Sequence, residues 1–236
     1  LVDRSELMDR LLQHLFPAFD RKLSLVMLQG PSGVGKSRLL HDLREQADPQ
    51  RLTVLLGGGL PYLASQPFGY LIDALGKVMR QDPRMVQLMG LALSPGDRLA
   101  VSRLLPDLVR HSLMDDVSGE EDRAELPRAF AQMLVALSKE KRLILLLDDF
   151  QWVDPGTLAT LTHLCDMADR NAMAVLIAMR SENLEAVSDE EATARETALR
   201  DFIGRMIRSN HLAGFPVPPL TRKGVAEMVA AILPNL

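Results

Sequence analysis

A run of eight residues, GPSGVGKS at positions 30–37, combines glycines, a lysine and a serine in the pattern G-x-x-x-x-G-K-[S/T]. The glycines let the backbone curl so that successive N–H groups point at one anion, and a following helix adds the positive end of its dipole. The lysine supplies a cation for the β- and γ-phosphates of a nucleotide, and the hydroxyl can ligate Mg²⁺. We therefore predict a phosphate-binding loop whose binding residues are Gly30, Ser32, Gly33, Val34, Gly35, Lys36, Ser37 and Arg38. Lys36 is also a candidate catalytic cation, and Ser37 is a candidate metal ligand.

The alternative for this segment is a glycine-rich turn that contains a lysine by chance. From average amino-acid composition, the pattern arises by chance in on the order of one per cent of chains of this length. Here an apolar run, LSLVML at 23–28, precedes the loop, and a helical pattern with Leu39, Leu40 and Leu43 on its apolar side follows it. A strand before the loop and a helix after it are the context that phosphate binding requires, so we favour a nucleotide site.

Two carboxylates, Asp148 and Asp149, directly follow the apolar run LILLL at 143–147. The carboxyl ends of parallel strands form the crevice in which such sheets bind ligands. In that crevice Asp148 would ligate Mg²⁺, and Asp149 would orient or deprotonate the water that attacks the nucleotide. The alternative is a helix N-cap beside a surface charge, and the phosphate loop upstream makes the catalytic interpretation the stronger one.

The residues after the two acids, FQWVDP at 150–155, precede a helix that we expect to begin near Gly156. Asp154 is suited to cap that helix, and a structural and a functional role are equally open for it. Trp152 is the only tryptophan in the chain, and we interpret it as a packing residue in preference to a stacking platform for a base.

Arg180 follows another apolar run, AVLIAM at 174–179. If this run forms the strand beside the one that bears Asp148, the guanidinium reaches the same crevice and could bind the γ-phosphate there. The alternative is an exposed arginine paired with Glu182. The five histidines and Cys165 show no metal-ligand spacing, and we place His163 and Cys165 on a helix of the core or its margin.

Four short apolar runs alternate with helical patterns along the chain, at 23–28, 52–56, 143–147 and 174–179. Continuous apolar runs of this length are typical of parallel strands covered by helices on both faces, which predicts an α/β fold. Residues 82–122 hold helically spaced leucines without a strand-like run, and we predict a helical insertion there. We predict a solvated loop for the polar residues 182–197, and a helix capped by Thr221 near the end of the chain.

The composition is that of a globular protein, with 47% hydrophobic and 25% charged residues in a chain of 236. A net charge of −4 argues against a standing basic surface for nucleic acid, so we expect no direct nucleic-acid binding. One cysteine allows no internal disulfide, as expected of a cytoplasmic protein, and no apolar run is long enough to span a membrane. The sequence begins without methionine and ends just after an expected helix, so we expect a fragment of a longer protein.

Together these motifs resemble the STAND class of P-loop ATPases, which is related to the AAA+ proteins. The resemblance is closest to the bacterial form found in MalT- and LuxR-type regulators, large adenylate cyclases and multidomain kinases. The matching segments are VDRSEL at 2–7, GPSGVGKSRLL at 30–40, LLPDL at 104–108, LLLDDFQWVDP at 145–155, MR at 179–180 and PLT at 219–221. The sequence departs from the family pattern at Asp3, where the family carries glycine.

The resemblance implies a P-loop NTPase fold of ASCE or AAA+ type, a three-layer sandwich around a parallel sheet. Its core would span residues 1–218, with the helical insertion at 82–122, and residues 219–236 would form the first helix of a helical subdomain. It also implies ATP or ADP with Mg²⁺ as ligands, and Val2 and Arg4 as further nucleotide-binding residues. Asp149, Lys36 and Arg180 would be the catalytic residues, with Arg180 as the strand-end sensor, and Ser37 and Asp148 would ligate the metal.

In function, the resemblance implies a regulatory switch that binds ATP and hydrolyses it slowly, inside a multidomain bacterial signalling protein or transcriptional regulator. Its partners would be effector and sensor domains of the parent chain and, in a nucleotide-dependent manner, further copies of the chain. One rival is an AAA+ ATPase that acts on DNA in replication initiation or transposition, against which the acidic balance weighs. Another is a nucleotide-binding scaffold without turnover, which we rank last because the key loop and acidic residues are intact.

Overall fold

A five-stranded parallel sheet forms the centre of the molecule, with the strand order β2-β3-β4-β1-β5. The computed structural model describes residues 4–18, 23–59, 66–108, 125–167, 172–180 and 190–232. The strands are β1 (Ser24–Gly30), β2 (Leu52–Gly58), β3 (Arg142–Asp148), β4 (Met173–Arg180) and β5 (Leu212–Pro216).

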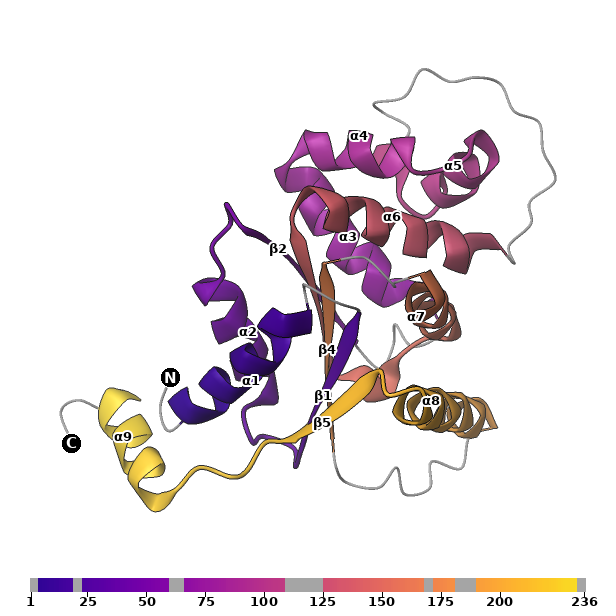
Figure 1. Ribbon diagram of the computed structural model, residues 1–236. Coiled ribbons are helices and arrows are strands. Elements are labelled where there is room, and N and C mark those ends of the chain that lie inside the picture. The colour runs from indigo at the N-terminus through magenta and orange to yellow at the C-terminus, as the bar shows by residue number, and fades with distance from the viewer. Residues whose placement is uncertain are drawn as a thin grey trace.

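Helices cover both faces of this sheet and make a three-layer sandwich (Figure 1). One face is covered by α1 (Ser5–Ala18) and α2 (Lys36–Gln46). The other is covered by α3 (Gly69–Gln81), α6 (Leu126–Glu140), α7 (Pro155–Met167) and α8 (Glu190–Arg208). The prediction of an α/β fold of the P-loop NTPase kind is therefore confirmed.

The central strands are apolar on both sides because each face has its own core. In β1, Val26 and Leu28 belong to the cluster under α1 and α2, whereas Leu25 and Met27 belong to the cluster under the other helices. All four residues are 5% exposed or less. This burial on both faces explains why the sequence shows continuous apolar runs instead of an alternating pattern.

The four strands expected from apolar runs are present, and the fifth strand was missed. In β5 the five residues LAGFP are only partly buried or exposed, and the strand lies at the edge of the sheet. Glycine and proline in this short strand, and the incomplete burial of its faces, leave no continuous run of large apolar residues to recognise. The helix α1 was also not predicted as an element.

Between β2 and β3 the chain adds α4 (Pro83–Leu91), α5 (Pro95–Ser102) and the short 3-10 helix η2 (Pro106–Leu108), which lie beyond α3 and α6 (Figure 1). Their prolines stand in the first turn, where no intrahelical N–H bond is lost. Asp82 and Ser94 cap these two helices by accepting bonds from the amides of Arg84 and Asp97. The remainder of the predicted insertion, residues 109–122, lies outside the described residues.

The predicted loop at 182–197 is wrong for its second half. Residues 190–197 form the first two turns of α8, and residues 182–189 lie outside the described part of the chain. Alanine, glutamate and arginine, which make up most of residues 190–197, have high helix propensity. This segment can therefore be helical although its sequence shows no apolar stripe. An i, i+4 ion pair between Glu196 and Arg200 supports the same helix.

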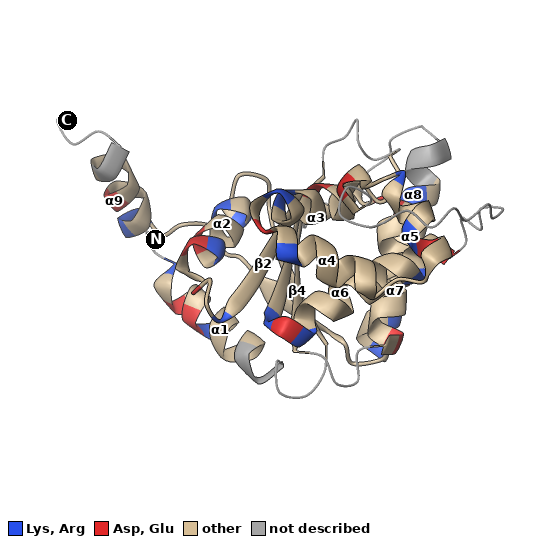
Figure 2. Cartoon of the chain, turned by 90° about the horizontal axis from the view of Figure 1, so that it is seen from above, with Lys and Arg blue, Asp and Glu red and all other residues tan. Residues whose placement is uncertain are grey.

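The last described helix, α9 (Arg222–Ile232), begins directly after Thr221, which caps it as predicted. The Thr221 hydroxyl accepts a bond of 3.1 Å from the Gly224 amide, which is the geometry of an N-cap. The helix stands away from the sheet in Figures 1 and 2, and Val225, Met228 and Val229 are 38–46% exposed. None of the helices in the described part of the chain is long and apolar enough to cross a membrane.

Candidate nucleotide-binding site

The predicted phosphate loop connects the carboxyl end of β1 to the first residue of α2. Two of its glycines adopt left-handed backbone conformations, Gly33 with φ 74° and Gly35 with φ 99°. Residues with a Cβ rarely adopt these angles, so the curled loop depends on glycine at both positions. The first turn of α2 directly follows, so the amino end of this helix, the positive end of its dipole, lies at the end of the loop.

Lys36 lies against the loop and not in solvent, although it is a lysine at a helix N-terminus. Its residue exposure is 7%, and its Nζ donates to the carbonyl oxygens of Gly30 and Pro31 at 2.8 and 2.9 Å. The ammonium is therefore held beside the curled backbone, where a phosphate would need a cation.

Gly30 marks a close approach between the loop and the segment after β5. A Cβ at this position would come within 2.8 Å of the Val217 carbonyl oxygen and 2.9 Å of the Val34 side chain. The Val217 amide also donates to the Gln29 carbonyl at 2.7 Å. The start of the loop is thus fixed by the segment that leads toward α9.

The second described contact to the loop comes from the N-terminal segment. Arg4 is 8% exposed, and its guanidinium donates to the Val34 carbonyl oxygen at 3.0 Å. Arg4 therefore touches the phosphate loop itself, and Val2 lies outside the described residues. Arg38 instead pairs with Asp42, one turn further along α2, at 2.9 Å.

Asp148 and Arg180 lie at the same edge of the sheet as the loop. β4 lies between β1 and β3, and Arg180 is in register with Gly30. The condition set for Arg180, that its strand neighbours the one bearing Asp148, is therefore met. Its guanidinium is exposed, and the alternative partner, Glu182, lies outside the described residues. Three strands thus bring the loop, the acids and the arginine to one edge of the sheet, the edge at which parallel sheets form their ligand-binding crevice.

Asp149 has an unusual backbone conformation, with φ 48° and ψ 43°. Its amide donates to the Asp148 carboxylate at 2.9 Å, and its own carboxylate accepts a bond of 2.9 Å from the Gln151 side chain. Its carbonyl oxygen accepts a bond of 2.7 Å from the Tyr70 hydroxyl. The motif that contains Gln151 was recognised without a role for this residue. Tyr70 was missed altogether, because it lies 79 residues away in sequence.

Asp154 has a structural role. Its carboxylate is 1% exposed and accepts bonds from the Thr157 amide and hydroxyl at 2.9 and 2.6 Å, as an N-cap of α7 does. It also accepts a bond of 2.6 Å from the amide of Phe68, next to α3. One buried carboxylate therefore joins the starts of two helices beside the acids.

We expect Asp154→Ala to lower the free energy of unfolding by about 2–4 kcal/mol, because the variant loses a helix cap and leaves buried N–H groups unpaired. Urea denaturation followed by circular dichroism measures the change. Asp166→Ala is the matched control, since Asp166 is an exposed acid on the same helix and should change stability by less than about 0.5 kcal/mol. Equal losses for the two variants would contradict the structural role of Asp154.

The sequence model of a family described as "AAA ATPase domain" matches residues 1–178, about three-quarters of the chain. The chain belongs to the AAA ATPase domain family. The matched region includes the phosphate loop, both acids, and all but the last two residues of β4. No curated protein matches the sequence.

Several solved structures are similar to this AAA ATPase domain at low sequence identity, and the one with a TM-score above 0.5 shares its fold. A Walker-type ATPase of Pyrococcus abyssi matches the whole chain with a TM-score of 0.53 and 15% identity, and the chain spans 59% of that protein. Cdc6p of Pyrobaculum aerophilum gives a TM-score of 0.47 at 15% identity, covering 96% of this chain and 48% of that one. Drosophila ORC bound to AT-rich DNA and Cdc6 gives 0.37 at 13% identity, covering 98% and 65%.

Membership in the AAA ATPase domain family implies nucleotide binding, and the crevice has the donor set for it. Ser37 and Asp148 fit a Mg²⁺ ion whose remaining ligands are phosphate and water oxygens, because Mg²⁺ is seldom held by protein groups alone. The described residues contain no cluster of three or more His, Cys, Asp or Glu side chains that could hold a metal by itself.

Cys165 lies away from this crevice on α7, with its Sγ 3.4 Å from the Met206 sulfur of α8. Burial raises the pKa of its thiol to about 12. The thiolate is the reactive form, so we expect the native AAA ATPase domain to react with a disulfide reagent at pH 8 about 1,000-fold more slowly than an ordinary thiol. Denaturation should restore the ordinary rate. Rapid labelling of the native chain would contradict this burial.

Proposed function

We propose that this AAA ATPase domain is a nucleotide-dependent switch of the STAND class, which binds ATP with Mg²⁺ and hydrolyses it slowly. The observation that carries the proposal is the meeting of the phosphate loop, the two acids and Arg180 at one edge of β1, β4 and β3. In this proposal Lys36 binds the β- and γ-phosphates, and Arg180 contacts the γ-phosphate. The loop amides hold the remaining phosphate oxygens.

In hydrolysis, Asp149 would accept a proton from water as the water oxygen bonds to the γ-phosphorus. The bond between that phosphorus and the β–γ bridging oxygen breaks, which gives ADP and inorganic phosphate. The magnesium ion would supply charge neutralisation at the phosphates when bound. Ser37 and Asp148 are the residues that we propose to hold it.

The switch itself would act through α9 and the segment before it. Val217, which leads toward α9, contacts the first glycine of the phosphate loop, so a change at the loop reaches this segment directly. We propose that residues 1–218 form the ATPase core and that residues 219–236 begin a helical subdomain. The exposed apolar side chains of α9 support contacts with effector and sensor domains, or with further copies of the chain.

Two measurements test this function. Turnover with ATP and Mg²⁺ should be slow, below about 1 s⁻¹, which is the low end of enzyme turnover numbers. Hydrogen exchange of α9 should differ between the ATP- and ADP-bound forms, because a ligand shifts an equilibrium only if it binds two states differently. Turnover at about 100 s⁻¹, or identical exchange in both forms, would contradict a regulatory switch.

A further inference from the structure

Two side chains without an assigned role, Tyr70 and Gln151, both bond to Asp149 from different parts of the chain. Tyr70 comes from the first turn of α3, and Gln151 from the 3-10 helix η4 (Phe150–Trp152). Both are strongly buried, at 3% and 5% exposure. We infer that they are positioning residues for hydrolysis, with Tyr70 fixing the backbone of Asp149 and Gln151 fixing its carboxylate. This inference rests on the proposed function, in which Asp149 is the base.

The backbone of Asp149 needs support because its left-handed conformation is costly for a residue other than glycine. Its carbonyl oxygen accepts two bonds, from the Tyr70 hydroxyl at 2.7 Å and from the Trp152 amide at 3.0 Å. The second bond is local to the turn. Within the described residues, the first ties this carbonyl to another helix, so Tyr70 sets where the turn lies relative to α3.

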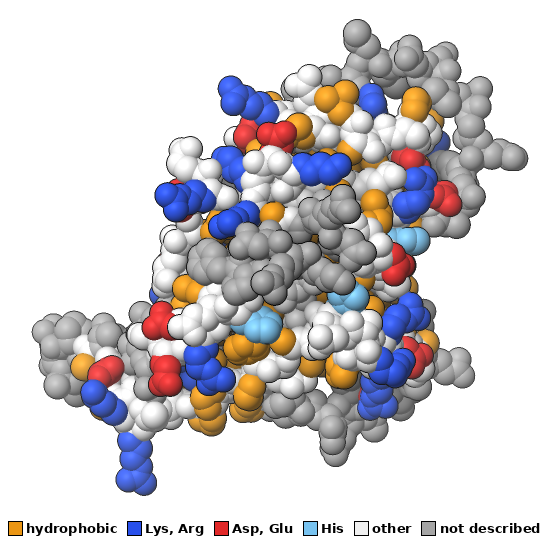
Figure 3. All heavy atoms as spheres, viewed as in Figure 1, with side chains coloured by type: hydrophobic (Ala, Val, Ile, Leu, Met, Phe, Trp, Pro, Cys, Tyr) orange, Lys and Arg blue, Asp and Glu red, His pale blue; other side chains and the backbone are white. Residues whose placement is uncertain are grey.

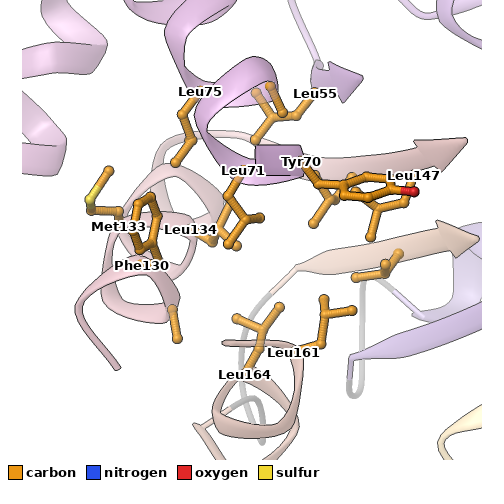
Figure 4. Packing of buried hydrophobic residues seen from close by; sticks show 14 of the residues in the cluster. Leu55, Tyr70, Leu71, Leu75, Phe130, Met133, Leu134, Leu147, Leu161 and Leu164 are labelled. Carbon is orange, nitrogen blue, oxygen red and sulfur yellow. The ribbon is translucent and has the colours of Figure 1, made fainter. Parts of the chain in front are cut away.

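Tyr70 is itself tightly placed. Its carbonyl oxygen would be 2.5 Å from a Cβ at Gly57, and its hydroxyl would be 1.7 Å from a Cβ at Gly59. Gly57 pairs with Leu147, beside which Tyr70 lies in Figure 4. Burial and the nearby Asp149 carboxylate raise the pKa of the Tyr70 phenol far above its usual value, so the hydroxyl stays a proton donor at every working pH.

The Gln151 side chain fixes the other end of Asp149. Its Nε2 donates to Asp149 Oδ1 at 2.9 Å, and its Oε1 is buried without a hydrogen-bond partner. Turning the amide over would bring two oxygens together and lose the bond, so the carboxylate itself selects this orientation. Burying an amide oxygen without a hydrogen-bond partner lowers the stability of the fold. The bond from Nε2 to Asp149 is therefore the role that the geometry indicates for Gln151.

The test measures single-turnover hydrolysis at saturating ATP and Mg²⁺ together with the Kd for ADP and the melting temperature. We expect Tyr70→Phe and Gln151→Met each to slow hydrolysis about tenfold, because a small displacement of a catalytic group is costly. The Kd for ADP should stay within about twofold, since neither side chain touches the phosphate loop. Gln132→Met is the control for Gln151, because Gln132 of α6 also has a buried Oε1 without a partner and should keep the wild-type rate.

Two further variants separate positioning from packing. Gln151→Glu keeps the shape but removes the donor, so it should lose at least as much activity as Gln151→Met, whereas a packing role predicts wild-type activity. Gly59→Ala places a Cβ against the Tyr70 hydroxyl and, at 3.1 Å, against the Asp149 carbonyl oxygen, so it should slow hydrolysis at least as much as Tyr70→Phe. Gly58→Ala is the control because a Cβ there meets nothing within 4 Å.

The outcomes distinguish this inference from the proposed function. If the wild type binds and hydrolyses ATP but Tyr70→Phe, Gln151→Met and Gln151→Glu keep its rate, the positioning role is overturned and the switch stands. If the slowing is matched by an equal loss of ADP binding, the two residues support the whole site and not Asp149 alone, which also overturns the inference. A wild type that binds no ATP overturns the proposed function and with it any role in hydrolysis.

Discussion

Asp149→Asn should reduce the rate of ATP hydrolysis by about 10²–10⁴-fold, the contribution typical of a positioned general base. The asparagine amide is close in shape to the carboxylate but accepts no proton from water at neutral pH. The Kd for ATP should change by less than about threefold, because in the proposed mechanism Asp149 would reach the phosphates only through the attacking water. A phosphate-release assay under single-turnover conditions measures the rate, and nucleotide titration measures the affinity.

The matched control for this variant is Asp107→Asn, in η2 of the segment that lies beyond α3 and α6. It removes one carboxylate from the same chain at a distance from the sheet edge, and it should hydrolyse ATP at the wild-type rate. If Asp149→Asn were as active as the wild type, the assignment of Asp149 as the base would be wrong, and a different group would have to activate the water.

Lys36→Ala should weaken nucleotide binding by at least about 100-fold. Bonds from a charged donor contribute about 1.5–3 kcal/mol each, and the ammonium can bond to two phosphates. The variant also loses two bonds to loop carbonyls, of which the bond to Gly30 is buried and the bond to Pro31 is partly buried, so its fold is checked separately. Anisotropy of a fluorescent ADP analogue measures the affinity, and circular dichroism checks the fold.

Arg44→Ala is the control for the charge change. Arg44 is an exposed cation in the last turn of α2, at the end far from the loop, and its loss should leave the affinity within about twofold. Equal losses of affinity for Lys36→Ala and Arg44→Ala would mean that nucleotide binding depends on the net charge of the protein and not on the loop. Positive and negative side chains are interspersed on the face shown in Figure 3.

Local chemistry in the sequence predicted the elements that build the crevice. The phosphate loop, the acids after β3 and the arginine after β4 were all found because each follows a strand buried on both faces, which leaves a clear apolar run. The strand order then follows from packing and not from any one motif. This strand order places Arg180, at the end of β4, between the loop after β1 and the acids after β3.

The contacts that sequence reasoning missed are those between segments far apart in the chain. Tyr70 shows no motif, and only the fold reveals that its hydroxyl meets Asp149. Similarly, the sequence leaves Asp154 open as a helix cap or a functional acid, and only the fold reveals its third bond, to the Phe68 amide, which gives it a structural role. The edge strand β5 and the polar start of α8 gave no apolar period, because neither depends on burying a continuous face.

The most direct test of the central claim is calorimetric titration of the folded wild-type chain with ATP and Mg²⁺. We predict one site with a Kd on the order of 1–10 μM, equivalent to a binding free energy of about −7 to −8 kcal/mol, and similar binding of ADP. The absence of any binding heat at millimolar ATP, from a chain that melts cooperatively, would contradict a nucleotide site at the crevice formed by β1, β4 and β3.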